Sequence, residues 1–303
     1  MSYTAKAASE VGRARTWTER VYLVSPLLLA AMKDIAAATK LAERWNRQTV
    51  EKMGATVVER NQSALRCLEA ASIPLVVQSG PFSGLAYDAL STGSLLGAKI
   101  LGCYEAEIGH WFKAAIDIAE YDTFIDVGCA EGYYAVGMAT KCLHLSVYAF
   151  DINESAQMMT EQLAARNHVN SRLTVGGECS PRVISELLKK SNLPLVLVDI
   201  EGHEDEFLDP ELVPELRYAD IIVELHEFKR PGLTYRLLSR FADSHEIEAV
   251  AAVPDPWKSE SLRYSHAIGL SVEVVAEGRH RPQIWLRMRA HYDKFGSCRS
   301  GKM

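Results

Sequence analysis

Hydrophobic positions divide the chain into a helical first part and a longer second part built from short β-rich runs. Between Leu27 and Trp45, apolar residues recur at three- and four-residue steps with Lys and Glu between them, which predicts a long amphipathic helix. Between Leu75 and Tyr87, a Val-Val pair, Ser-Gly-Pro and a second apolar stretch predict two short strands around a turn. Residues 97–119 contain a glycine-rich joint and then one more amphipathic helix.

After Tyr121, β-rich runs alternate with helical stretches. Because the first five runs are spaced for strand-helix-strand units, their crossovers predict a mainly parallel sheet covered on both faces. The last two runs have a polar, proline-containing loop between them and are predicted to pair antiparallel. The fold class is therefore α/β, with a mainly helical N-terminal extension. The seven runs are Thr123–Val127, Ser146–Phe150, Arg172–Val175, Leu195–Val198, Ile221–Leu225, Ile247–Val253 and Ile284–Met288.

Composition narrows the class of protein without naming it. Hydrophobic residues make up 48% of the 303 residues and charged residues 24%, a balance typical of a globular protein. The net charge of -6 disfavours a general nucleic-acid binder, although a local basic patch stays an alternative. The six cysteines form no Cys-x-x-Cys pair, and the apolar stretch from Val21 to Met32 is too short to cross a bilayer. We therefore expect a cytoplasmic protein with reduced thiols and no secretory signal.

A glycine-rich turn follows the first run of the second part. It joins the run that ends at Val127 to a helix predicted to begin near Tyr133, so its backbone is open to a ligand. A dinucleotide loop needs glycine at the first, third and sixth positions, which this turn lacks. The alternatives are a loop for a nucleoside without phosphates and a turn that only connects strand to helix. Its residues are Asp126, Val127, Gly128, Cys129, Ala130, Glu131 and Gly132.

Charge separates the two ligand classes at this turn. A carboxylate about 4 Å from a pyrophosphate costs about 4 kcal/mol at an effective dielectric constant of 20, and a helix N-terminus returns only about 0.3–1 kcal/mol. For a ligand with an ammonium or sulfonium centre, Asp126 and Glu131 become favourable instead. S-adenosylmethionine is such a ligand, so the acidic loop favours it over a dinucleotide.

An acid after the second run supports a nucleoside ligand. Asp151 follows Phe150, and a carboxylate there accepts hydrogen bonds from both ribose hydroxyls; the alternative is that it caps the next helix. After the third run, Glu178 and Cys179 occupy the position at which an adenine edge is expected, an assignment that depends on position alone.

The fourth and fifth runs both end in polar residues that favour a reaction site. Parallel strands present their carboxyl ends at one edge of a sheet, and with a period of two, Glu224 and His226 share a face. A hydroxyl substrate needs a base, and a histidine beside a carboxylate titrates near neutral pH, so His203 or His226 is the predicted base. Two alternatives stay open. In the first, Glu224 is a buried partner of a backbone group and His226 lies in solvent. In the second, Asp199, Glu224 and His226 hold a divalent metal.

Taken together, these motifs resemble the class I S-adenosylmethionine-dependent methyltransferases and, within them, the FkbM family. The resemblance covers about residues 97–289, and the Asp-Ile-Glu-Gly block is its most specific piece. It implies a Rossmann-like seven-stranded mostly parallel sheet whose seventh strand is antiparallel. The motifs are Phe124–Tyr134, Ala149–Asn153, Val198–Glu204 and Ile222–His226, with a lead-in at Gly102–Glu107.

The resemblance also implies the function and the site. We expect S-adenosylmethionine as cofactor and O-methylation of a small-molecule hydroxyl, on a sugar or natural-product-like acceptor. Alternatives are a methyltransferase for RNA or another macromolecule, a nicotinamide or nucleotide-sugar oxidoreductase, and a non-catalytic adaptor. The predicted catalytic residues, without a metal, are His203, His226, Glu201 and Glu224. The predicted cofactor-binding residues are Asp126, Gly128, Cys129, Ala130, Glu131, Gly132, Tyr133, Asp151, Ile152, Glu178, Cys179, Asp199, Tyr104 and Glu105.

Three parts are expected: residues 1–96 as the helical region with a hairpin, 97–292 as the methyltransferase domain, and 293–303 as a tail. The first region matches no family by its motifs, so its helices are expected either to select the substrate or to form a homodimer surface.

Overall fold

The structure is a computed structural model, and it describes residues 57–89, 91, 94–252, 272–275, 277, 283–291 and 293. The helix predicted between Leu27 and Trp45 lies outside these residues, as does most of the predicted tail. The helices are α3 (Val57–Ala70), α4 (Leu96–Leu101), α5 (Gly109–Ile118), α6 (Tyr133–Lys141), α7 (Glu154–Arg166), α8 (Pro181–Lys190), α9 (Glu204–Phe207), η1 (Pro214–Tyr218), α10 (Leu233–Phe241) and α12 (Val272–Val275). The strands are β1 (Thr123–Val127), β2 (Ser146–Phe150), β3 (Leu173–Gly176), β4 (Pro194–Val198), β5 (Asp220–Leu225), β6 (His245–Ala251) and β7 (Ile284–Ala290).

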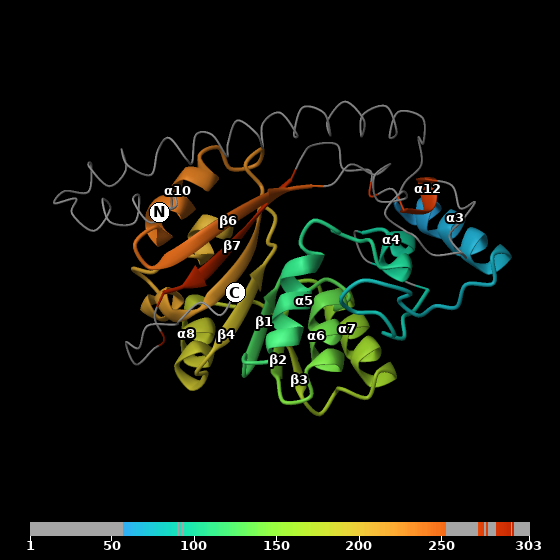
Figure 1. Ribbon diagram of the computed structural model, residues 1–303, viewed down its shortest axis with the longest axis horizontal. Coiled ribbons are helices and arrows are strands. Elements are labelled where there is room, and N and C mark those ends of the chain that lie inside the picture. Colours follow the sequence, from blue (N-terminus) through green and yellow to red (C-terminus); the bar gives the residue numbers. More distant parts are fainter. Residues whose placement is uncertain are drawn as a thin grey trace, which may run out of the picture.

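The seven strands form one sheet in the order β3-β2-β1-β4-β5-β7-β6 (Figure 1). Strands β1 to β5 are parallel to one another, and β7 is antiparallel to both β5 and β6. This confirms the prediction of a Rossmann-like, mostly parallel α/β sheet with an antiparallel final pair. The strand order reverses between β1 and β4, and open α/β sheets bind ligands at the carboxyl edge beside such a reversal.

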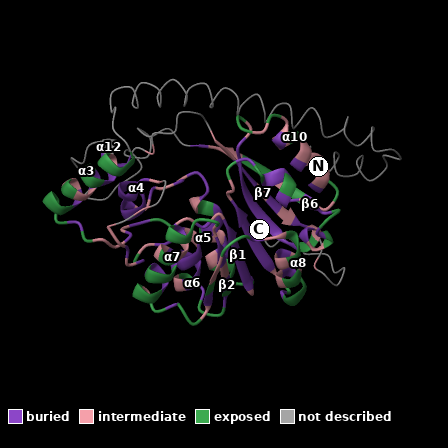
Figure 2. Ribbon diagram, turned by 180° about the vertical axis from the view of Figure 1, so that it is seen from behind, coloured by how far each residue is buried: buried purple, intermediate pink, exposed green. Residues whose placement is uncertain are grey.

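The alternation of side chains along the strands explains the two hydrophobic cores. Phe124 on β1 and Leu195 on β4 face a core built with α5, α6 and α7, whereas Ile125 and Val196 face a second core built with α8 and α10. Strands β1, β4 and β5, in the middle of the sheet, are consequently buried along their whole length, as their apolar runs require. Figure 2 shows the buried strands and the exposed outer faces of the surrounding helices.

Helix boundaries follow local capping chemistry. Asn153 accepts a hydrogen bond from the Ser155 amide at the start of α7, and Ser180 accepts one from Val183 at the start of α8. A side-chain oxygen at this position satisfies an amide that has no partner within the helix. Because Asn153 is the cap of α7, Asp151 is left for another role.

The described part of the N-terminal region packs on the first core. Val76 and Ala86 form an antiparallel bridge, which agrees with the predicted pairing around a turn. Between them, Phe82 lies edge-on to Tyr133 of α6 at 5.3 Å between ring centroids. A Cβ atom on Gly137 would come within 2.6 Å of the Phe82 ring, so only glycine allows this contact. The region thereby covers the helix that follows the glycine-rich turn.

Two smaller predictions concern thiols and membranes. Among the described residues, the cysteines Cys67, Cys103, Cys129, Cys142 and Cys179 form no disulfide. Among the described residues, no helix has both the length and the apolar character that crossing a membrane requires.

Candidate functional site

The candidate site lies at the carboxyl edge of the sheet, where β1, β2, β4 and β5 end side by side. The sheet register pairs Val127 with Phe150 on one side and with Val198 on the other, so the residues after these three strands are neighbours. The register brings the predicted cofactor loop, the predicted ribose acid and the predicted reaction site to one edge, as expected for parallel strands.

The glycine-rich turn needs glycine because the backbone passes close to the end of β4. Gly128 has a φ of 88°, and a Cβ atom there would lie 1.8 Å from the carbonyl oxygen of Asp199. Ala130 also has a positive φ, of 48°, and its amide donates a hydrogen bond of 2.9 Å to Asp151. Gly132, with a φ of 90°, then starts α6. The turn therefore connects the ends of β1, β2 and β4 through its main chain.

Asp126 is a buried acid at the end of β1. Its side chain accepts a hydrogen bond from the amide of Ala135, but Oδ2 is buried without a hydrogen-bond partner. Burial raises the pKa of this carboxyl to about 8, and the nearby Asp151 and Glu105 carboxylates add to the effect. At neutral pH this carboxyl therefore holds a proton, and a cation placed beside it would favour its ionised form.

Asp151 is half-buried and points back at the turn. Oδ2 accepts from Ala130, and Oδ1 accepts from the amide of Asn153 at 2.8 Å. Each carboxylate oxygen has a second lone pair, so the group keeps capacity for ribose hydroxyls. Next to it, the side chain of Ile152 is 84% exposed, an apolar surface suited to an adenine ring.

The two residues predicted at the adenine edge differ in burial. Glu178 is exposed after β3, whereas Cys179 is buried in the second core, where burial raises the pKa of its thiol to about 12. Cys129, within the turn, is also buried, and burial raises its pKa as well. Both thiols are therefore uncharged at neutral pH.

Glu131 behaves differently from the prediction. Its buried carboxylate forms an ion pair with the Lys99 ammonium of α4 and accepts hydrogen bonds from Tyr87, at 2.9 Å, and from Ser91. The Lys99 charge is the main reason why the pKa of Glu131 falls despite its burial. The sequence predicts an uncompensated negative charge of Glu131 at the ligand, and this is wrong because the Lys99 ammonium neutralises it.

The lead-in before α5 also reaches this region. Glu105 is buried with a φ of 46°, and its carboxylate accepts a hydrogen bond from the Tyr134 hydroxyl. Tyr104 is half-buried, and the Lys99 ammonium lies 4.7 Å from its ring centroid. Tyr133 is buried among aromatic rings, at 5.6 Å from Tyr104, so its side chain belongs to the core.

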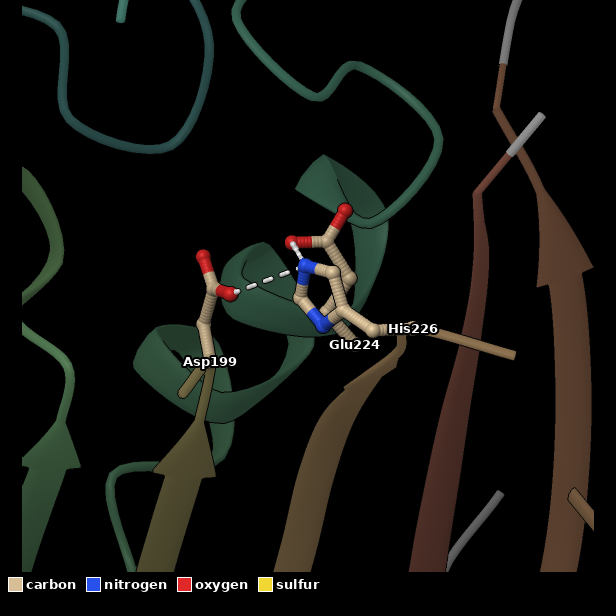
Figure 3. Close-up of side chains that lie close together, drawn as sticks. All are labelled: Asp199, Glu224 and His226. Atoms are coloured by element: carbon tan, nitrogen blue, oxygen red, sulfur yellow. Dashed lines mark ion pairs between the residues drawn. The ribbon is translucent and has the colours of Figure 1, made fainter. Parts of the chain in front are cut away.

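The ends of β4 and β5 bring together Asp199, Glu224 and His226 (Figure 3). The Nε2 atom of His226 lies 3.8 Å from Asp199 Oδ1 and 3.9 Å from Glu224 Oε2. The Glu201 carboxylate is 3.3 Å from the same nitrogen. His226 is buried, which rules out the alternative that it lies in solvent at the strand end.

Glu204 completes this arrangement and was not among the predicted site residues. It is fully buried, and its Oε1 accepts a hydrogen bond of 2.7 Å from Nδ1 of His226 and another of 2.9 Å from the Gly202 amide. The bond fixes the imidazole tautomer and directs Nε2 toward the acids. The sequence signal was present, since Glu204 is the second residue after the Asp-Ile-Glu-Gly block, but only the fold brings it to the histidine 22 positions later.

His203 is not brought to this group, in contrast to its prediction as a catalytic base. Its side chain is 69% exposed, and Nδ1 contacts Glu206 at 3.1 Å. Glu201 has a φ of 59° and an exposed carboxylate that forms an ion pair with Lys229. Of the two histidines, only His226 therefore faces the carboxyl edge.

The electrostatics of the group are dominated by like charges. Burial and the Glu224 carboxylate raise the pKa of Asp199 well above its usual range. Burial alone would lower the pKa of His226, but the Glu204 hydrogen bond and the Glu224 charge raise it overall. The group thus binds protons, and by the same physics it attracts a cation.

Comparison with known proteins adds one curated relative. No protein-family model matches the chain. The chain is 25% identical over 177 residues to the tetracenomycin polyketide synthesis 8-O-methyl transferase TcmO of Streptomyces glaucescens. The match covers 58% of this chain and 47% of the relative, so the chain spans about half the length of that protein.

Solved structures show distant similarity. The O-methyltransferase TomG from Streptomyces achromogenes, in complex with S-adenosylmethionine, is 12% identical with a TM-score of 0.41, and the match covers 82% of this chain and 98% of TomG. The B. subtilis M1A22 tRNA methyltransferase TrmK is 11% identical with a TM-score of 0.36, covering 57% of this chain and 64% of TrmK.

Proposed function

We propose that the chain is an S-adenosylmethionine-dependent methyltransferase that transfers a methyl group to a hydroxyl of a small molecule, such as a sugar or a natural product. The observation that carries this proposal is that three groups lie together at one edge of a seven-stranded sheet. Asp126 is a buried acid with an unpartnered oxygen, Asp151 is an acid placed to bind a ribose, and His226 is an imidazole aimed at a reaction site. The partial similarity to an O-methyltransferase supports the same function.

The donor side of the crevice suits a cationic nucleoside. The Asp151 carboxylate binds the ribose hydroxyls, each hydrogen bond to a charged group being worth about 1.5–3 kcal/mol. The exposed Ile152 side chain packs against the adenine. Asp126 and Glu105, both buried, lie on this side, and a sulfonium or ammonium group beside Asp126 would favour the ionised form of its carboxyl. A pyrophosphate would instead bring further negative charge to these acids, which disfavours a nicotinamide oxidoreductase.

The acceptor side supplies the proton acceptor. The hydroxyl oxygen forms a bond to the methyl carbon while the carbon–sulfur bond breaks and its electron pair passes to sulfur. The hydroxyl proton passes to Nε2 of His226, whose ring Glu204 holds in place through Nδ1. Asp199 lies between the donor loop and His226 and positions the acceptor. Holding both reactants in line supplies most of the acceleration.

Finer assignments belong to the same proposal. The Asp-Ile-Glu-Gly block, which begins at Asp199, favours the FkbM family among class I methyltransferases. We assign residues 97–292 to the methyltransferase domain, with residues 1–96 as a helical region for acceptor selection or homodimer formation and 293–303 as a tail. A cytoplasmic location and a small-molecule acceptor complete the proposal.

Calorimetry with S-adenosylhomocysteine and with NAD tests the cofactor. The expected result is binding of S-adenosylhomocysteine and none of NAD; binding of NAD alone, or of neither compound at millimolar concentration, would refute the proposal. A methyl-donor assay across sugars, phenols, small RNAs and peptides, read by mass spectrometry, then identifies the acceptor. Donor binding without transfer to any of them, together with unchanged cellular function of a His226→Gln variant, would indicate an adaptor instead.

A further inference from the structure

The ends of β4 and β5 direct three different ligand atoms to one point. Asp199, Glu224 and His226 each offer one atom, and all three atoms lie within 4.8 Å of one another. Figure 3 shows both carboxylates near the same nitrogen of the imidazole ring. A proton shared between the two acids would satisfy only two of these atoms, whereas a single cation satisfies all three.

The buried atoms at this point are aimed into the group without hydrogen-bond partners. The His226 side chain is only 1% exposed, and its Nε2 atom makes no hydrogen bond. Oδ1 of Asp199 is likewise buried without a hydrogen bond. Unpartnered buried polar atoms are rare and call for a ligand. These two atoms face each other across 3.8 Å, a separation that suits ligands of one ion.

Glu204 gives the imidazole the orientation of a metal ligand. Its Oε1 accepts from Nδ1 at 2.7 Å, so the lone pair of the neutral ring is on Nε2 and points at the two acids. Metal-bound histidines almost always donate their other ring N–H to a carboxylate or carbonyl in this way. Glu204 is 0% exposed, so its position is held by the surrounding chain.

We infer that Asp199, Glu224 and His226 bind one divalent cation, Mg²⁺ or Mn²⁺, with Glu204 as the positioning residue for the histidine. Two carboxylates with one imidazole form a donor set that suits these ions. Both ions prefer six ligands, so three protein ligands leave positions for water and for an acceptor oxygen. A cation there lowers the pKa of a bound hydroxyl, a role that rests on the proposed function and would replace His226 as base.

Binding of Mn²⁺ alone to the full chain tests the site without donor or acceptor. Titration followed by electron paramagnetic resonance is expected to show one bound ion, with nitrogen couplings from the imidazole in the spin-echo spectrum. Asp199→Asn, Glu224→Gln and His226→Gln are each expected to weaken binding at least about tenfold, and His226→Gln removes the nitrogen coupling. Glu204→Gln is expected to weaken binding about tenfold while the nitrogen coupling persists.

Glu206→Gln is the matched control. Glu206 is an exposed carboxylate two residues from Glu204 that pairs with His203 and Arg230 instead of the cluster, so its change is expected to leave Mn²⁺ affinity unaltered. Thermal melting verifies that each variant is folded. No bound Mn²⁺ at millimolar concentration, or affinity that survives both Asp199→Asn and His226→Gln, would overturn the inference.

Donor binding on the same preparation separates the two proposals. Mn²⁺ binding without affinity for S-adenosylhomocysteine would leave the cation site standing and refute the proposed function. Affinity for S-adenosylhomocysteine without Mn²⁺ binding would refute the cation site and leave His226 as the base.

Discussion

Two acids at the same edge of the sheet, the buried Glu131 and the half-buried Asp199, have opposite surroundings. Glu131 lies after β1 with an ammonium group and two hydroxyl groups around its carboxylate. Asp199 lies after β4 with a second carboxylate, Glu224, as neighbour and one oxygen without a hydrogen bond. The surroundings lower the pKa of the first acid and raise that of the second.

These different surroundings distinguish a structural acid from a functional one. A buried charge whose partners are all within the chain becomes destabilising only when a partner is removed, and it has little left to offer a ligand. A buried acid beside a like charge destabilises the chain until a proton, a cation or a substrate arrives. Acidic residues near a ligand loop are equivalent in the sequence, and only their partners separate these two cases.

Removing the Asp199 carboxylate is expected to have the largest effect. Asp199→Asn should reduce kcat/KM for methyl transfer about a thousandfold, equivalent to about 4 kcal/mol, because the acceptor loses its positioning acid. The thermal midpoint should not fall, since the change relieves repulsion with Glu224. Steady-state kinetics and melting curves measure both. A large loss of stability, instead of activity, would mean that Asp199 is structural like Glu131.

Breaking the ion pair between Lys99 and Glu131 should, in contrast, mainly lower the stability of the fold. Lys99→Met leaves a buried carboxylate uncompensated and is expected to lower the free energy of unfolding by about 3 kcal/mol, the lower end for a broken buried pair because Tyr87 still donates to Glu131. Adding Glu131→Gln to this variant should recover part of the lost stability. Denaturant titration measures the free energy of unfolding of both variants.

The control for that experiment is an exposed pair of the same chemistry. Lys113 and Asp117 lie 3.0 Å apart on α5 with both side chains more than half exposed, and Lys113→Met should cost less than about 0.5 kcal/mol. Equal costs for the two lysine variants would contradict the structural role of Lys99.

The ribose acid is expected to affect donor affinity. Asp151→Asn should weaken S-adenosylhomocysteine binding by about 1.5–3 kcal/mol, or about ten- to a hundredfold, because it loses the charge that accepts the two hydroxyls. Calorimetry measures the dissociation constant, with Glu154→Gln on the exposed first turn of α7 as control. Unchanged affinity would argue that Asp151 only supports the turn.

Asp126 should make the stability of the ligand-free protein depend on pH. Its pKa is raised from 3.8 to about 8, so between these values the folded chain holds a proton that the unfolded chain has lost. The free energy of unfolding should therefore fall as pH rises from 6 to 8, by at most about 1.4 kcal/mol per pH unit. Asp126→Asn should flatten this slope, and denaturant titrations at several pH values measure it. A wild-type slope retained in the variant would assign the effect to another group.

The smallest effect is expected at His203. Its exposed ring pairs with Glu206, which lies outside the group around His226, so His203→Ala should change kcat/KM less than about twofold and stability less than about 0.5 kcal/mol. Loss of activity comparable to that of His226→Gln would reverse the assignment of the two histidines.

The fold was largely predictable because it depends on local patterns. Continuous apolar runs such as Leu195–Val198, followed by helical stretches with a proline or a capping residue at their start, specify strand-helix-strand units wherever they occur. The parallel order and the antiparallel final pair agree with that pattern. The gathering of the residues after β1, β2 and β4 at one edge could be predicted as well, since parallel strands end at one edge.

The partners of each acid were not predictable from the pattern. Lys99 precedes Glu131 by 32 positions and reaches it only because α4 packs against the turn, and Glu204 meets His226 only because β4 and β5 are neighbours. Both histidines follow acidic residues in the sequence, yet one is 69% exposed and the other 1%.

Hydrophobic spacing by itself determined the α/β class and the edge at which polar residues gather, because burial of apolar side chains acts along each segment separately. The tertiary structure alone decided which acid is neutralised and which stays unsatisfied, because electrostatic energy depends on distances between segments that the chain order leaves open. Glu131 and Asp199 show that difference most clearly.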